Sequence, residues 1–132
     1  GSIEMGKAVM WQDKVARELQ DYKVTIFNPR REHYVWKGGV SIEDKKFIEQ
    51  VSWELKALEK SDFIILYCDP KSKSPISLLE LGLFARSHNI FCCCPKEFWR
   101  DGNVEFICQK FKIPLFHNLE DLMKKFKNKL PK

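Results

Sequence analysis

The sequence has no apolar segment long enough to cross a membrane. None of its apolar runs approaches the roughly 18 consecutive residues that a membrane-spanning helix needs, and we expect no signal peptide. Internal repeats and low-complexity stretches are absent too. With 132 residues and 44% hydrophobic content, the chain is long enough to bury a core of its own. We therefore expect one globular domain over residues 1–132, with no membrane partner.

Metal-binding motifs are absent as well. His33, His88 and His117 are isolated, with no cysteine or acid at the spacing of a metal site. Cysteines 92–94 are consecutive, and neighbouring residues of a strand point to opposite faces of a sheet. These three thiols therefore cannot converge on one ion, and we assign neither a metal site nor a cofactor.

The five cysteines indicate a cellular compartment. Four of them fall in apolar stretches that predict strands, and their number is odd. This pattern is typical of reduced thiols that fill the core of an intracellular protein. We expect a cytoplasmic protein whose cysteines act as small core side chains.

Much of the net charge of +5 comes from lysines near the C-terminus, and no aromatic residues alternate with them. Lysines at the end of a helix complement its dipole and keep a protein soluble. A nucleic-acid surface usually combines basic with aromatic side chains. We therefore do not expect a nucleic-acid partner.

Strand and helix patterns alternate along the chain. Strands are predicted at 23–27, 63–68, 90–94 and 113–116, and helices at 7–20, 42–60, 74–85, 104–111 and 119–129. The apolar stripe of the second helix predicts five core residues, Phe47, Ile48, Val51, Leu55 and Leu58. Residues 30–41 read as a surface loop whose length and aromatic content favour a functional role. The alternation predicts an α/β protein whose parallel sheet carries helices on both faces.

The chain opens with a glycine-containing turn. Residues 1–6 lead directly into the first predicted helix, where backbone amides can meet an anion. In an α/β unit such a turn normally follows a strand, and none precedes it here. We therefore expect that the first strand of the sheet is missing before residue 1.

One carboxylate, Glu80, lies inside the nearly apolar helix 74–85. At about 100° per residue, it shares a face with Ile76, Leu83 and Phe84. A buried glutamate is unusual unless it is paired or takes part in chemistry. Glu80 is therefore the strongest functional candidate in the sequence.

Purely structural roles are open for the same helix. Ser77 and Glu80 have the spacing of a capping box, in which the glutamate only returns a hydrogen bond to the helix start. Ser74 followed by Pro75 is typical of an N-cap with proline at the first helical position. Gly82 lowers helix propensity, and close approach by a ligand or a helix would explain it.

A second carboxylate, Glu54, lies at the edge of the apolar stripe of helix 42–60. Two partly buried carboxylates from consecutive helices suit glycosidic chemistry, in which one attacks the anomeric carbon and the other stabilises the site or moves a proton. Glu54 could instead pair with Lys45 or Lys60. Many α/β domains contain two such acids, so the spacing alone does not decide.

Four segments of the chain resemble one family. They are Gly1-Ser2-Ile3, Asn28-Pro29-Arg30-Arg31, Glu54-Leu55 with Ser61-Asp62, and Ser77-Leu78-Leu79-Glu80-Leu81-Gly82. Together they are similar to the nucleoside 2-deoxyribosyltransferase-like family, to which 2'-deoxynucleoside 5'-monophosphate N-glycosidases are related. The resemblance covers nearly the whole chain.

The resemblance implies a flavodoxin-like, doubly wound parallel sheet and a homodimer or higher homo-oligomer whose subunits complete each other's sites. It also implies an enzyme in which Glu80 is the nucleophile and Glu54 the second acid, where the family usually has aspartate. The expected reaction is cleavage of the base–deoxyribose bond through a glycosyl-enzyme at Glu80. Transfer to another base or to water completes the cycle, as in a transferase or a hydrolase.

The resemblance further implies a small-molecule nucleoside or nucleotide as ligand. The expected substrate-binding residues are Gly1, Ser2, Ile3, Asn28, Arg30, Arg31, Trp36, Ser74 and Ser77. Ser74 matches a phosphate-binding serine of the monophosphate-specific relatives. Glu4 stands where those relatives have arginine, and its charge would repel a 5'-phosphate. The choice between nucleoside and nucleotide stays open, with the balance toward a nucleoside-like ligand.

Two other functions are compatible with the sequence. The longer side chain of Glu54 suits a non-catalytic nucleotide-binding or sensing module that has kept the pocket but lost turnover. A plain interaction domain of the same fold is the other. Trp53 and Trp99 are expected to serve packing or a subunit interface rather than catalysis.

Overall fold

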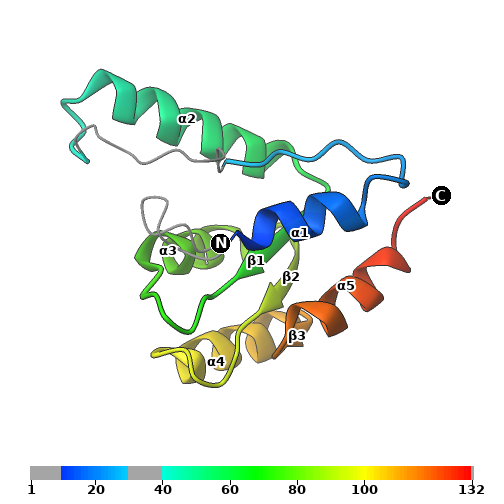
Figure 1. Cartoon of the computed structure of the whole chain (residues 1–132). Helices are drawn as coiled ribbons and strands as arrows, with labels where there is room; N and C mark the ends of the chain where they lie inside the picture. The colour runs from blue at the N-terminus through cyan, green and yellow to red at the C-terminus, as the bar shows by residue number, and fades with distance from the viewer. Residues whose placement is uncertain (1–9, 30–39, 132) are drawn as a thin grey trace.

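The computed structural model describes residues 10–29 and 40–131 of the chain. This part contains three parallel strands, β1 (Phe63–Tyr67), β2 (Asn89–Cys93) and β3 (Leu115–Phe116), joined in the order β1-β2-β3. Its five helices are α1 (Trp11–Glu18), α2 (Lys45–Lys60), α3 (Pro75–Phe84), α4 (Asp101–Phe111) and α5 (Leu119–Lys127) (Figure 1). The molecule is an α/β protein consistent with a flavodoxin-like fold.

The β1–β2 pair forms the centre of the structure. The two strands run in register from Phe63 opposite Asn89 to Tyr67 opposite Cys93. They are rich in β-branched, aromatic and cysteine side chains, and side chains on both faces are covered, as expected in a parallel sheet. Short loops and helices lead from one strand to the next.

A separate hydrophobic core lies on each face of the sheet. One core packs α3 and α4 against the sheet through Leu81, Phe84 and Val104, among others. The other packs α1 and α5 against the opposite face through Trp11, Val15 and Leu122, among others. The prediction that helices cover both faces is therefore confirmed.

All five cysteines are buried and free of disulfide bonds. Four of them (Cys68, Cys92, Cys94 and Cys108) belong to the core beneath α3 and α4, and Cys93 belongs to the other. The prediction that they act as small core side chains is confirmed.

The predicted strand at 23–27 is wrong. Residues 24–29 have no regular secondary structure and pair with none of the three described strands. Ile26 and Phe27 are exposed. Val24, Thr25 and Ile26 have high β-propensity, but propensity produces a strand only where a neighbouring edge completes its hydrogen bonds.

The predicted burial of α2 is wrong too. No residue of α2 is buried, although Leu55 and Leu58 pack partly against the core beneath α3 and α4. Ile48 is exposed. Figure 1 shows α2 along one side of the molecule, away from the sheet. The apolar period identified the helix and its inner face, but a period cannot show how completely other elements cover that face.

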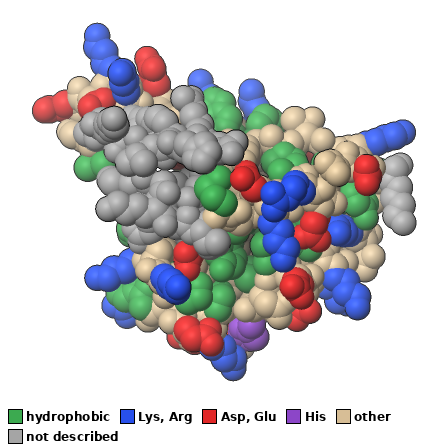
Figure 2. Space-filling model, viewed as in Figure 1, with side chains coloured by type: hydrophobic (Ala, Val, Ile, Leu, Met, Phe, Trp, Pro, Cys, Tyr) green, Lys and Arg blue, Asp and Glu red, His purple; other side chains and the backbone are tan. Residues whose placement is uncertain are grey.

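Charges of both signs are interspersed on the face shown in Figure 2. Lys127 on α5 forms an ion pair with Glu18 on α1 at 3.0 Å, and Lys14 lies 3.9 Å from Glu120. Some of the basic charge is therefore paired between α1 and α5. None of the helices in the described ranges has the length and apolar character required to cross a membrane.

Helix α5 depends on a side-chain cap at its start. The Asn118 side chain accepts a hydrogen bond from the backbone amide of Asp121 at 2.8 Å. We predict that Asn118→Ala lowers the free energy of unfolding by about 1 kcal/mol, because that amide loses its partner. Urea denaturation followed by circular dichroism measures the change. Asn128→Ala at the other end of α5 is the matched control, and an equal effect of both variants would contradict the cap.

Candidate functional site

The loop between β1 and α3 leaves the carboxyl end of the sheet and leads directly into the helix that carries Glu80. Ser74 occupies the N-cap position of α3, and Pro75 begins the helix, as predicted. The Ser74 hydroxyl does not cap the helix; instead its Oγ lies 2.6 Å from Ser72 Oγ. Both serines are buried. Ser74 also has left-handed backbone angles (φ 48°, ψ 52°), which cost about 1–2 kcal/mol for a residue other than glycine.

The capping-box interpretation of Glu80 is wrong. A capping box needs its serine at the N-cap and its glutamate three residues later. Because the N-cap is Ser74, Ser77 lies inside the helix and Glu80 lies near its middle. The carboxylate is therefore too far along α3 to bond the helix start. Ser77 itself is buried.

Helix α3 is less buried than its sequence suggested. Ile76, Leu79 and Leu83 are 59%, 60% and 56% exposed, so they form an uncovered apolar stripe. Gly82 faces open space, with no atom within 4 Å of the position that a Cβ would take. The expectation that a neighbouring helix approaches this glycine closely is therefore wrong for the described residues, whereas close approach by a ligand stays a prediction. Leu81 and Phe84 provide the buried contacts of the helix.

Glu80 lies partly buried between solvent and the protein interior. Burial raises the pKa of its carboxyl above the ordinary value of 4.5, and the negative charge of Glu54 raises it further. The two acids come from consecutive helices, as the sequence indicated, and they are close enough for one charge to act on the other. Neighbouring carboxyl groups of this kind are common at catalytic sites.

Glu54 has a neutral partner rather than a cation. Gln50, one turn earlier on α2, donates a hydrogen bond from Nε2 to Glu54 Oε1 at 3.0 Å. The structure gives Glu54 no ion pair with Lys45 or Lys60, so the surface ion-pair interpretation is wrong. An amide donor fixes the orientation of the carboxylate without neutralising its charge.

Two polar residues at the end of β1 were missed by the sequence analysis. Asp69 is buried, and its Oδ1 accepts the backbone amide of Lys71 at 2.9 Å. Tyr67 packs its ring against Trp11, with 5.5 Å between centroids. Burial, and then the charge of Asp69, raises the pKa of Tyr67. Asp69-Pro70 directly follows an apolar strand, and that position could have indicated a site residue.

Most of the other predicted binding residues lie outside the described part of the chain. Asn28 is partly exposed in the irregular segment 24–29. Six predicted positions lie outside the described residues, namely Gly1, Ser2, Ile3, Arg30, Arg31 and Trp36. Their roles stay predictions. In the described ranges, no three or more His, Cys, Asp or Glu side chains are grouped so that they could hold a metal ion.

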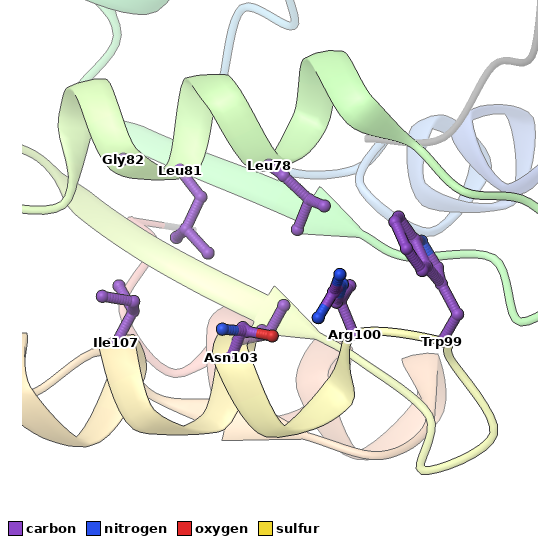
Figure 3. A pocket seen from close by; sticks show the side chains of 8 residues that line it. Leu78, Leu81, Gly82, Trp99, Arg100, Asn103 and Ile107 are labelled. Atoms are coloured by element: carbon purple, nitrogen blue, oxygen red, sulfur yellow. The ribbon is translucent and has the colours of Figure 1, made fainter.

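A groove with a volume of about 440 Å³ separates α3 from α4. Leu78 and Leu81 of α3 point toward Asn103 and Ile107 of α4, and Trp99 lies at one end of the groove, beside Arg100 (Figure 3). Glu80 does not line this groove. Two residues along an α-helix turn a side chain by about 200°, so Glu80 projects away from the groove that Leu78 enters. The acids and the groove are therefore separate features.

The two acids offer a direct test of their proximity. We predict that Glu54→Gln lowers the pKa of Glu80 toward its ordinary value, because a negative charge that disfavours its ionisation is removed. A carbon-detected NMR titration of the side-chain carboxyls measures the shift. Glu49→Gln, on an exposed position of the same helix, is the control. An unchanged Glu80 pKa in Glu54→Gln would show that the two acids do not interact.

Comparison with known proteins identifies one family. A family model described as nucleoside 2-deoxyribosyltransferase like matches residues 1–98, which is 98 of the 132 residues. The matched segment contains α1, α2, β1, α3 and β2, with both Glu54 and Glu80. A search of curated proteins finds no match.

Proposed function

Because the chain belongs to the nucleoside 2-deoxyribosyltransferase-like family, we propose that it cleaves the N-glycosidic bond of 2'-deoxynucleosides or their monophosphates. One observation carries the proposal. Glu80 lies partly buried inside α3, with a pKa raised by burial and by Glu54, and it has no capping role. A partly buried carboxyl group whose pKa is raised by a second acid suits glycosidic chemistry, which uses a pair of acids.

In the proposed reaction, the ionised carboxylate of Glu80 attacks the anomeric carbon of deoxyribose. The bond to the base breaks, and the base leaves with the bonding electron pair and takes up a proton. The sugar is then esterified to Glu80. Water hydrolyses this ester to deoxyribose, or to deoxyribose 5-phosphate from a monophosphate; alternatively, the nitrogen of a second base displaces Glu80 and forms a new nucleoside or nucleotide. Either step returns the carboxylate to its starting state.

Glu54 is the second acid of this mechanism. We propose that the Glu54 carboxylate, whose orientation is restrained by the hydrogen bond from Gln50, lies beside the bound sugar. In that position it can stabilise the positive charge that develops on the sugar or move a proton to the leaving base. The neighbouring negative charge also makes Glu80 a stronger base and therefore a stronger nucleophile once it is ionised.

The ligand is proposed to bind at the carboxyl end of the sheet. The buried hydroxyls of Ser72 and Ser74 are suited to bond the sugar hydroxyls or a 5'-phosphate. We propose Arg30, Arg31 and Trp36, together with residues 1–3, as further contacts on the strength of the family resemblance. Glu4 favours an uncharged nucleoside over its monophosphate.

We predict that Glu80→Gln abolishes base release, with a loss of roughly a thousandfold or more, because an amide cannot form the glycosyl ester. The assay incubates the protein with each deoxynucleoside and its monophosphate, with and without an acceptor base, and follows free base by chromatography. Glu49→Gln controls for removal of an exposed acid, and circular dichroism checks the fold. Full activity in Glu80→Gln would overturn the assignment of the nucleophile.

A nucleotide sensor is the second candidate function. The observation in its favour is the glutamate at position 54, where the family usually has aspartate. The longer side chain moves the carboxyl group by one carbon–carbon bond, and small displacements of catalytic groups can remove much of an enzyme's rate. Saturable binding of a nucleotide without any base release would favour this candidate over the enzyme.

We also propose that the protein forms a homo-oligomer through the apolar stripe of α3, made of Ile76, Leu79 and Leu83. Exposed apolar residues at helical spacing are costly in water unless a partner covers them. The stripe lies on the helix that carries Glu80, so a second subunit there would lie beside the candidate site.

We predict that Leu83→Lys lowers the oligomeric mass measured by sedimentation, because a charge in the stripe would have to be desolvated at the interface. Phe106→Lys, which changes an exposed apolar residue on α4, is the matched control. An unchanged mass in Leu83→Lys, or an equal loss in both variants, would contradict an interface at this stripe.

A further inference from the structure

The loop between β1 and α3 is held by several local hydrogen bonds. The Asp69 side chain accepts the amide of Lys71 at 2.9 Å, and the Asp69 carbonyl accepts the amide of Ser72 at 3.0 Å. The hydroxyls of Ser72 and Ser74 meet at 2.6 Å. Ser74 nevertheless has a left-handed backbone, which a residue other than glycine keeps only where its surroundings enforce it.

One of the contacts that enforce this loop comes from a distant segment. Trp99, in the loop between β2 and α4, donates its indole N–H to the backbone carbonyl of Lys73 at 2.8 Å. Lys73 directly precedes the left-handed Ser74. The bond therefore restrains the peptide group that sets the direction in which Ser74 enters α3. Trp99 lies one residue beyond the segment that the family model matches.

The position of Trp99 is itself fixed by the core. The preceding residue, Phe98, is 1% exposed, and its amide donates to the carbonyl of Pro95 at 3.0 Å. The amide of Asp101 donates to the carbonyl of Phe98 at 3.1 Å. The backbone on both sides of Trp99 is thus held in a tight turn, which provides a rigid base for the indole ring.

Packing alone does not explain the orientation of the Trp99 ring. Trp99 is 50% exposed, so its burial stabilises the fold less than the burial of a core tryptophan would. Two cations lie over the ring, with Arg100 Cζ at 4.7 Å and Lys73 Nζ at 5.6 Å from its centroid. These contacts favour the orientation in which the N–H points at Lys73, beside Arg100 at the end of the groove (Figure 3).

We infer that Trp99 is a positioning residue for the substrate-binding loop. Its indole N–H holds the Lys73 carbonyl and thereby keeps the Ser72 and Ser74 hydroxyls in the orientation that receives the ligand. The effect on catalysis rests on the proposed N-glycosidic function, whereas the effect on the loop does not. Trp99 touches neither of the two acids in this scheme, so it acts on ligand binding and leaves the chemistry at Glu80 intact.

The test is Trp99→Phe, which keeps an aromatic ring for the two cations and removes the N–H. We predict that amide hydrogen exchange in residues 69–78 becomes about fivefold faster, as expected when one hydrogen bond is lost. For the deoxynucleoside or monophosphate that the wild type cleaves best, KM rises by about the same factor while kcat stays within about twofold. Trp53→Phe, the same change at an exposed position of α2, is the control.

Unchanged exchange in residues 69–78 of Trp99→Phe, or exchange equal to that of Trp53→Phe, would overturn the inference. Faster exchange with an unchanged KM would overturn the role in ligand binding. A large fall in kcat at constant KM would do the same, because it would place Trp99 in the chemical step. Absence of base release by the wild type would refute the proposed function. The amide hydrogen exchange of residues 69–78 would then still test whether Trp99 positions the loop.

Discussion

The parallel pairing of β1 with β2 is the constraint on which the candidate site depends. Because the strands run in the same direction and in register, the loops that follow them emerge at the same edge of the sheet. The first loop carries Asp69, Ser72 and Ser74, and the second carries Trp99. A hydrogen bond between the two loops is possible only because the pairing places their ends side by side. An antiparallel arrangement would send these loops to opposite edges.

Burial has a double effect on the acid pair. It raises the pKa of Glu80, and it reduces the screening of the charge on Glu54, so the two carboxyl groups sense each other more strongly than they would in water. An acid that held only a structural role could be replaced by an apolar side chain at a gain in stability. Partial burial of two carboxyl groups that repel each other lowers local stability, and such a cost is typical of functional sites.

The sequence predicted those features that depend on local pattern. The apolar runs of β1 and β2 and the helical periods of α2 and α5 identified elements that the structure contains, with ends that differ by a few residues. Segment 23–27 failed because strand formation requires a partner that composition does not reveal. The sequence predicted that Glu54 and Glu80 lie on consecutive helices, as they do in α2 and α3, but their chemical roles stay predictions. The Trp99 contact could not have been predicted, since a side chain that bonds a backbone carbonyl 26 residues away leaves no sequence pattern.

The weak attachment of α2 has a consequence for how the protein loses its site. This helix contributes Glu54 but no buried residue, whereas α3, which contributes Glu80, is anchored by Leu81 and Phe84. Segments with few buried contacts open at a lower free energy than the sheet they rest on. Detachment of α2 would therefore separate the two acids while β1, β2 and both cores remain folded. We therefore expect the integrity of the acid pair to depend on this local opening as well as on the global stability of the chain.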